Sequence, residues 1–416
     1  MTDKHVCLVT PGHPSTNPRV VKEADALIAA GYKVSVVSGR YFAWADQADH
    51  AFAERPWKIV ERVAFGQRAP KWQRIRQGLV RRLCIGLFGA LGRHAMHFPR
   101  LAALAWHPAA WDLGRAAARV KADIYIGHNL AALPAVAWAA HAHAARFAFD
   151  AEDYHFGELS AHGADSVRQR MVDAIDRRWL PQCAYVTAAA PGIAEALARR
   201  YGIGAPTVLL NVFPMVPVSM QPKKDRGQQP SLYWFSQTIG LDRGIQTVIK
   251  AVAVSRTRPA LYLRGNISES SRDGLQRVAA EVGMLDGLHF MPLAPPDMMA
   301  ALAAAHDVGL ATETGFSDNN DRAISNKLFT YLSAGVPVLA SNTSGQAWLA
   351  HRVPGAIQIF EQNDYESLAR SIDAWLGDKR ALAVASEIAR QSATTEFNWE
   401  TEAAKLITLV DDTLSA

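Results

Sequence analysis

The chain has 416 residues, 49% of them hydrophobic, and carries a formal net charge of +5. At roughly 150 residues per domain this length predicts two or three domains, and the apolar content is enough for well-packed cores. The mild basic excess is compatible with an anionic ligand, an anionic membrane surface or nucleic acid, and charge by itself does not select among them.

Two further patterns bear on the compartment. No run approaches the ~18 consecutive apolar residues that span a bilayer, and the N-terminus lacks the ~7–15-residue apolar core of a signal peptide. The three cysteines are far apart and have no metal-ligand spacing: Cys7, Cys84 and Cys183. We therefore expect a reduced, cytoplasmic location.

The chain opens with a strand, a turn-rich loop, a helix and a second strand. Residues 6–10 form a short apolar run, residues 19–30 repeat apolar side chains every 3.6 positions, and residues 33–38 are again apolar. This βαβ unit places the loop at 11–18, with Gly12 and Asn17, at the carboxyl edge of a parallel sheet, where ligands bind. The loop has no GxGxxG pattern, so no dinucleotide fingerprint is present.

Residues 67–100 differ from the rest, because arginines alternate there with large apolar side chains such as Trp72, Leu79 and Leu83. Such a basic amphipathic stretch suits a helix lying in the surface of an anionic membrane. A pair of core-facing helices with one solvated basic side explains the pattern equally well.

Two more strands, near 123–129 and 146–150, end in polar residues. His128 closes the first, and the second leads into Glu152, Asp153 and His155. At the ligand edge of a sheet these groups could bind sugar hydroxyls or act as acid or base; otherwise they are structural side chains, solvated loops or helix caps.

A polar run at 216–230 has the composition of a linker, and the strand–helix alternation restarts after it. We predict an N-terminal Rossmann-like domain over 1–215, this linker, a C-terminal Rossmann-like domain over 231–395, and a terminal helix over 396–416 that packs back on the first domain. Strand followed by helix throughout predicts two parallel α/β sheets facing across a cleft.

The stretch 325–341 predicts a helix start, a short helix and a buried strand. Ser325 can cap the first turn, Gly335 suits the left-handed position after a helix, and residues 336–340 are apolar. The helix N-terminus together with Lys327 makes an anion site. Taken alone, this stretch favours an ordinary capped helix packed on a sheet over an anion site.

Several motifs in order resemble those of GT-B fold glycosyltransferases, most closely the GT4-like group (glycosyl transferase group 1). Residues 16–24 with 29–34 resemble the family's N-terminal segment, and residues 242–245 resemble its "RG" loop. Residues 325–338 are similar to the family's "NKLFEYLAAGxPVV" segment, and residues 398–400 match a common ending. The resemblance spans nearly the whole chain.

The resemblance implies a nucleotide-diphosphate sugar held mainly by the C-terminal domain, with the acceptor on the N-terminal domain and no metal or cofactor. Arg243 would pair with the diphosphate, and His128 matches a family histidine near the transferred sugar. Transfer would be of the hexosyl, retaining type, with the leaving phosphate helping to deprotonate the acceptor. On this basis the candidate residues are His128 and Asp153 for catalysis; Gly12, Arg243, Asn266, Ser325, Asn326, Lys327 and Thr330 for the donor; and Asn17, Glu152 and His155 for the acceptor.

Two departures from the family pattern concern the donor site. The family's two glutamates, eight positions apart, read Arg322 and Thr330 here, and the glycine and basic residue of the "GR" loop read Gln237 and Thr238. A ribose contact could come instead from Glu313, Asp318 or Asp321. The run 318–321 is interpreted as turn formers rather than as a metal site.

The main hypothesis is therefore a glycosyltransferase acting on a glycan or lipid-linked acceptor of polysaccharide biosynthesis. It would be cytoplasmic and peripheral at the inner membrane face through residues 67–100, and would not bind nucleic acid. The alternative is a non-catalytic GT-B-like binding subunit, since both glutamates are missing. A nucleotide-sugar epimerase would need an acidic constellation that the sequence does not show.

Overall fold

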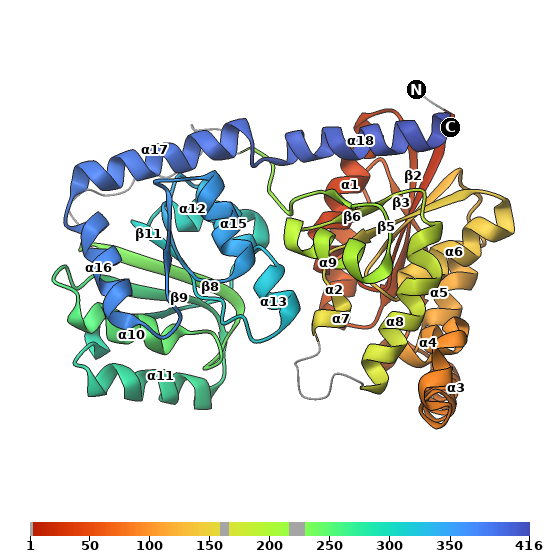
Figure 1. The fold of residues 1–416 in the computed structure, drawn as a ribbon, viewed down its shortest axis with the longest axis horizontal. Coiled ribbons are helices and arrows are strands. Elements are labelled where there is room, and N and C mark those ends of the chain that lie inside the picture. The colour runs from red at the N-terminus through yellow and green to blue at the C-terminus, as the bar shows by residue number, and fades with distance from the viewer. Residues whose placement is uncertain (1–2, 159–165, 216–228) are drawn as a thin grey trace. The chain divides into compact units, whose positions relative to one another are not determined.

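The computed structural model describes residues 3–158, 166–215 and 229–416, which form two compact units. The first comprises Met1–Leu210, Ser317–Asn319 and Ala403–Ala416, and the second comprises Asn211–Phe316 and Asn320–Glu402. Each unit is a parallel sheet with helices on both faces (Figure 1). Most of the predicted linker, residues 216–228, lies outside the described residues. Across the described ranges, no helix is both long and apolar enough to cross a membrane.

The sheet of the first unit has seven parallel strands in the order β3-β2-β1-β4-β5-β6-β7. Its strands are β1 (His5–Thr10), β2 (Lys33–Arg40), β3 (Lys58–Ala64), β4 (Ile124–His128), β5 (Arg146–Ala151), β6 (Val186–Ala188) and β7 (Thr207–Val208). Its helices are α1 (Pro18–Ala29), α2 (Ala43–Ala48), α3 (Lys71–Ala90), α4 (Pro99–Trp106), α5 (Ala110–Ala117), α6 (Ala132–His143), α7 (His155–Glu158), α8 (Val167–Trp179) and α9 (Pro191–Tyr201).

The sheet of the second unit has six parallel strands in the order β10-β9-β8-β11-β12-β13. Its strands are β8 (Ser231–Ile239), β9 (Ala260–Ile267), β10 (Leu288–Met291), β11 (Val308–Ala311), β12 (Val338–Ser341) and β13 (Ile357–Phe360). The helices that follow the linker are α10 (Ile245–Val254), α11 (Glu269–Glu281), α12 (Met299–Ala303), α13 (Asp318–Arg322), α14 (Asn326–Ser333), α15 (Ser344–Arg352), α16 (Tyr365–Leu376), α17 (Lys379–Thr395) and α18 (Trp399–Ser415).

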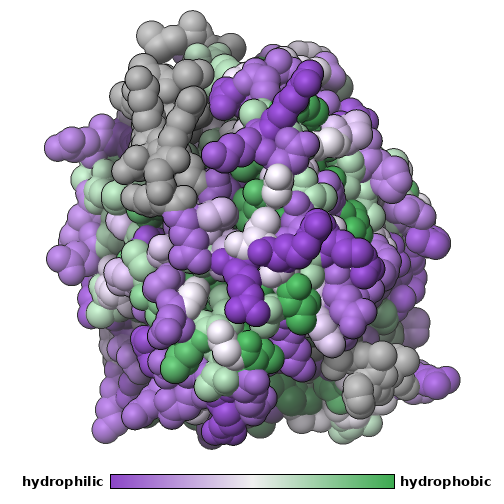
Figure 2. Space-filling view, turned by 90° about the vertical axis from the view of Figure 1, so that its left-hand side faces the viewer, coloured by the Kyte–Doolittle hydropathy of each residue, from purple (hydrophilic) through white to green (hydrophobic). Residues whose placement is uncertain are grey.

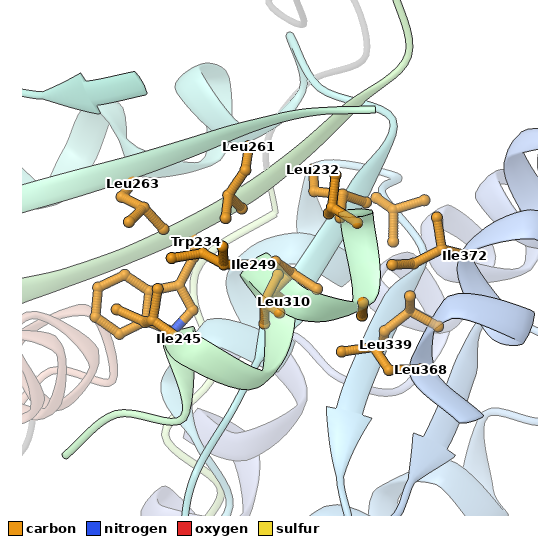
Figure 3. Close-up of a cluster of buried hydrophobic side chains, with 14 of the residues drawn as sticks. Leu232, Trp234, Ile245, Ile249, Leu261, Leu263, Leu310, Leu339, Leu368 and Ile372 are labelled. Atoms are coloured by element: carbon orange, nitrogen blue, oxygen red, sulfur yellow. The ribbon is translucent and has the colours of Figure 1, made fainter. Parts of the chain in front are cut away.

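Each unit has its own apolar core between sheet and helices. In the second unit β8, α10 and α16 supply much of it (Figure 3), and its largest side chains are Trp234 and Trp375. In the first unit Leu406 and Val410 of α18 join side chains of β1 and α1 in one buried cluster. The hydroxyl of Tyr32, just after α1, also donates to Asp411 of α18. The last turns of the chain thus complete the core of its first unit.

The α/β class with two parallel-sheet domains is confirmed, and four local interpretations need correction. Strands β3 and β13 were not predicted, because their short runs mix polar and apolar residues. The apolar run 207–211 predicts a strand, and the strand formed there ends at Val208. The polar segment 312–324 predicts a long loop, and the structure has the short helix α13 within it. Trp106, Trp111 and the nearby alanines predict a helical region to about residue 120, and the structure divides it, because α4 ends at Trp106 and α5 begins at Ala110.

Candidate functional site

The second unit has a topological switch point between β8 and β11. From these two neighbouring strands the chain proceeds to β9 on one side and to β12 on the other. Ligands of open α/β sheets bind beyond the carboxyl ends of the strands at such a point. Arg243 lies in the loop after β8, and Glu313 lies two residues beyond β11.

Glu313 is held by two groups at the start of α14. The Lys327 ammonium donates to Glu313 Oε1 over 2.6 Å, and the Ser325 hydroxyl donates to the same oxygen over 2.9 Å. Burial raises the pKa of Glu313, but Lys327 and then Arg243 lower it more, so the net pKa falls below its ordinary value. The Lys327 ammonium also lies 5.4 Å from the Trp234 ring centroid. Lys327 is therefore a cation already paired with an ionised carboxylate.

This arrangement corrects the predicted cap of α14. Ser325 occupies the N-cap position with an extended backbone, but its side chain accepts no amide of the first turn, because its hydroxyl is directed to Glu313. Asn326, the first helical residue, is exposed. At the other end Gly335 has φ of +66°, the left-handed conformation that the sequence predicted. The N-terminal amides of α14 are thus not capped by Ser325.

The loop that carries Arg243 is tied to the end of β11. Trp234 donates its indole N–H to the Thr312 hydroxyl over 3.0 Å, and that hydroxyl donates to the Arg243 carbonyl over 2.5 Å. The next residue, Gly244, has φ of +69°, and a Cβ there would lie 3.0 Å from the Thr312 carbonyl oxygen. Only glycine fits this turn without strain. The Arg243 side chain, 38% exposed, is therefore fixed at its base and partly open to solvent.

Two other predicted donor residues are placed differently. Thr330 is buried, and its hydroxyl donates to the Asn326 carbonyl within α14 over 3.1 Å. Its oxygen is thus engaged by its own helix. Asn266 is exposed but lies within β9, which is separated from the switch point by β8. Neither residue joins Glu313, Ser325 and Lys327.

The first unit has its own switch point, between β1 and β4, and a buried group of charges lies beside it. Arg19 of α1 forms two hydrogen bonds with Asp150 at the end of β5, one of them 2.7 Å long. The ring of His128, at the end of β4, lies 3.2 Å from Glu23 and 3.3 Å from Asp150. All four side chains are at most 1% exposed.

His128 and Asp150 are held ionised by their neighbours. Burial lowers the pKa of His128, but Glu23, Asp150 and Glu152 raise it well above its ordinary value. Burial raises the pKa of Asp150, but Arg19 and His128 lower it far more. Two cations and three carboxylates therefore form one network, and none of the four buried groups reaches solvent.

We also tested whether this group could hold a metal ion, because ligand atoms of Glu23, His128 and Asp150 lie within 4.8 Å of one another. Arg19 already occupies Asp150, and the two His128 nitrogens face different carboxylates. The guanidinium and the imidazolium thus supply the positive charge that a metal would bring.

The acceptor-side candidates lie at the edge of the same network. Asn17 caps α1, accepting from the amides of Arg19 and Val20, while its amide group donates to Glu152 Oε1 over 2.6 Å. The Glu152 side chain is 20% exposed, and its Oε1 lies 3.4 Å from the His128 ring. Glu152 is therefore the point at which this network meets solvent.

The remaining candidates follow β1 and β5 in the chain. Asp153 accepts from Asn319 over 2.9 Å, and burial raises its pKa. Burial lowers the pKa of His155, but Glu158 raises it above its ordinary value. The Leu130 amide donates to His155 Nε2 over 3.0 Å and limits this rise, because a nitrogen that accepts carries no proton. Gly12 follows β1 with ordinary φ and room for a Cβ, so no backbone geometry requires glycine there.

Sequence reasoning missed Arg19, Glu23 and Asp150, as well as Trp234 and Thr312. A signal existed for the first pair, because Arg19 and Glu23 are opposite charges four residues apart on the same helix as the buried Val20 and Leu27. Charges on a buried face require partners. No comparable pattern marked the other three residues.

Comparison with known proteins gives no match to any protein-family model, and none to the curated proteins. Solved structures do match. Anabaena Alr3699/HepE in complex with UDP and glucose superposes with a TM-score of 0.69 at 14% identity, covering 98% of this chain and 100% of that chain. Sucrose-phosphate synthase from Thermosynechococcus elongatus gives 0.67 at 15% identity, covering 99% of both chains. WaaG, a glycosyltransferase involved in lipopolysaccharide biosynthesis, gives 0.62 at 15% identity, covering 97% of this chain and 99% of that chain.

These likenesses extend over nearly the whole chain and confirm the predicted fold. The chain has the GT-B fold, that of the glycosyltransferases which its motifs resemble.

Proposed function

We propose that the protein is a glycosyltransferase that uses a nucleotide-diphosphate sugar. The observation that carries this proposal is the switch point of the second unit, where the start of α14, Lys327 and Arg243 lie together beyond β8 and β11. Helix N-termini, lysine and arginine are the groups that bind phosphates in proteins. The HepE structures with UDP and with UDP-glucose support this choice of ligand.

The donor diphosphate would compete with Glu313 for Lys327. A dianionic group at the helix start attracts the ammonium more strongly than one carboxylate does, so Lys327 would turn to the phosphate, which the uncapped amides and Arg243 would also contact. Glu313, released from Lys327, would then be the carboxylate available to a ribose hydroxyl. This exchange explains how the site could work without glutamates at Arg322 and Thr330.

In the proposed reaction the bond from the sugar to the diphosphate breaks, and a bond from the same carbon to an acceptor oxygen forms. The acceptor oxygen attacks the carbon on the face that the diphosphate leaves, so the configuration is retained. The acceptor proton passes to the leaving diphosphate, and no metal or other cofactor takes part. Lys327 and Arg243 stabilise the charge that develops on the diphosphate. Asn17 and Glu152 would bind acceptor hydroxyls. His128, with no exposed surface, would act as a positioning residue for Glu152.

The test is nucleotide release from a panel of UDP-, GDP-, dTDP- and ADP-sugars. We expect one donor to be hydrolysed or transferred, with Lys327→Met and Arg243→Met each lowering the rate at least ~10-fold. Lys250→Met, which removes an exposed lysine of α10, is the control and should leave the rate unchanged. Wild-type rates in both active-site variants would refute the assignment.

A non-catalytic binding subunit is the second candidate, favoured by Arg322 and Thr330 at the two glutamate positions. It predicts that a nucleoside diphosphate raises the melting temperature, by mass action, while no donor is turned over. Melting scans with UDP, GDP, dTDP and ADP beside the release assay separate the two. Binding without release in a folded protein supports the subunit, and release supports the enzyme.

We further propose that the acceptor is lipid-linked and that α3 binds the inner membrane face. One side of α3 exposes large apolar residues, with Trp72 67% and Leu83 66% exposed, and others at helical spacing: Ile75, Leu79 and Leu87. Exposed arginines accompany them, among them Arg74, Arg81 and Arg82. Elsewhere, the face in Figure 2 is mostly hydrophilic, with hydrophobic side chains in small separate groups. An apolar ridge beside cations suits an anionic bilayer.

Liposome flotation tests this placement. Vesicles with anionic lipid should carry the protein to the top of the gradient, and Leu83→Asp/Leu87→Asp should abolish that. Val384→Asp, at another exposed apolar residue, on α17, is the matched control. Absence of flotation with wild-type protein would reject membrane binding.

A further inference from the structure

A pocket of about 700 Å³ lies in the first unit among α4, α5, α6 and α8, apart from the residues assigned above to the donor and the acceptor. Its walls are largely aromatic and aliphatic, with Trp111, Trp138 and Trp179 joined by Phe98, Leu101 and Leu104. The Trp138 ring centroid lies 6.3 Å from that of each of the other two indoles. A volume of this size is typical of small-molecule sites.

The glycine in α5 shapes this pocket. A Cβ on Gly114 would lie 2.3 Å from the Trp138 ring, so the missing side chain lets that indole lie against the helix. Trp111, on the same helix, lines the pocket and is half exposed. The pocket is thus a shaped apolar recess with an aromatic side.

Three arginines line the pocket and are exposed: Arg100, Arg115 and Arg178. Within the described ranges none of them forms an ion pair, whereas Arg76, Arg119 and Arg200 of the same unit each pair with a carboxylate. Of the described residues that line the pocket, none is acidic. The positive charge around the recess is therefore not neutralised by nearby carboxylates, and arginine is well suited to a phosphate.

The pocket is close to the apolar surface of α3. Helix α4 begins at Pro99, one of the lining residues, and packs against both α3 and α8 (Figure 1). Helix α4 thus connects the recess with α3, whose exposed side we assign to the membrane. A hydrocarbon chain leaving a bilayer at α3 would reach apolar walls nearby.

We propose that this pocket binds a single anionic phospholipid, with acyl chain against the three indoles and phosphate at the arginines. The proposal requires neither sugar transfer nor a nucleotide. It goes beyond membrane contact at α3, because it assigns one lipid molecule to a defined cavity.

The probe is dihexanoyl phosphatidylglycerol below its micelle concentration, added to the full chain while tryptophan emission is recorded. We expect a saturable change, about tenfold weaker binding in Arg115→Gln/Arg178→Gln, and unchanged binding in Arg277→Gln, an exposed arginine of α11. Ala118→Phe adds a ring to a lining position and should block binding of the lipid. The emission change that inorganic phosphate alone causes should be no larger in this variant than in wild type. Circular dichroism of each variant establishes that it is folded.

Other outcomes overturn the proposal. Equal affinity for dihexanoyl phosphatidylcholine would show that the arginines do not select an anionic head. Equal affinity for glycerol phosphate would show a simple anion site with no role for the apolar walls. If the arginine variant does not fold, undiminished binding in Ala118→Phe is sufficient to reject the pocket.

Discussion

The charged groups at the carboxyl edges of the two sheets differ in how deeply they are buried and how fully they are paired with other side chains of the protein. In the first unit Arg19, His128 and Asp150 are buried and bound to one another. In the second, Lys327 and Glu313 form one pair whose side chains are 13% and 15% exposed. A fully buried network fixes the backbone around it, whereas a partly exposed pair can exchange one partner for a ligand. The same fold thus supports a rigid edge in one unit and an exchangeable one in the other.

The energetic reason lies in desolvation. Removing a single partner from a buried ion pair leaves a charge that neither water nor protein compensates, and the loss is large. A pair with some solvent access loses much less, because water replaces the partner. Mutations at the two edges should therefore separate stability from binding.

The largest expected effect comes from Arg19→Met, which leaves Asp150 and Glu23 buried without their guanidinium. We expect the free energy of unfolding of the first unit to fall by about 3–5 kcal/mol. Urea titration with hydrogen exchange of first-unit amides measures it. Arg55→Met, which removes the exposed pair with Asp25, should cost no more than about 1 kcal/mol. Similar losses in both variants would contradict the distinction between buried and exposed pairs.

A second prediction concerns Asp176, a carboxyl of α8 whose burial raises its pKa to about 7. This folded-state pKa exceeds the unfolded one near 3.8. The carboxyl therefore does not lower the free energy of unfolding below pH ~4, and it lowers it increasingly as the pH rises toward 7. Asp176→Asn removes the charge, so its melting temperature should exceed that of wild type by roughly 3 °C or more at pH 8. Calorimetry at pH 4.5 and pH 8 measures the difference, which should be small at the lower pH.

The control for this effect is Asp173→Asn in the same helix, where the carboxylate pairs with Arg200. That variant should lose stability at pH 8 rather than gain it. If the melting temperature of wild type does not decline relative to that of Asp176→Asn between pH 4 and 7, Asp176 ionises with an ordinary pKa.

The smallest effect is expected at Thr330, whose hydroxyl bonds to its own helix. Thr330→Val should cost about 1 kcal/mol of stability and change nucleotide affinity less than twofold, because no ligand would reach that oxygen. Isothermal titration with the nucleotide that binds wild type measures the affinity. A loss of nucleotide affinity as large as that of Lys327→Met would show that Thr330 belongs to the donor site.

Local sequence patterns were sufficient for the alternation of strands and helices, since apolar runs and the 3.6-residue period reflect burial directly. They also located His128 at the end of β4 and Gly335 in a left-handed turn. They were insufficient for partners distant in the chain. Arg19 and Asp150 are 131 residues apart, and nothing near either residue specifies the other. Ser325 shows a second limit, because its expected cap was displaced by a carboxylate from another loop.

The terminal helix has a consequence for biosynthesis. Leu406 and Val410 share a core with Val6 and Leu8, so side chains about 400 positions apart must meet before the first sheet is complete. During translation the N-terminal strands leave the ribosome long before α18 exists, and chain-distant contacts of this kind form slowly. The part of this cluster that α18 covers should therefore stay exposed until α18 has been made, although α1 already covers the rest. A ribosome-bound chain stopped at residue 395 should bind a holdase chaperone that the released, full-length chain does not.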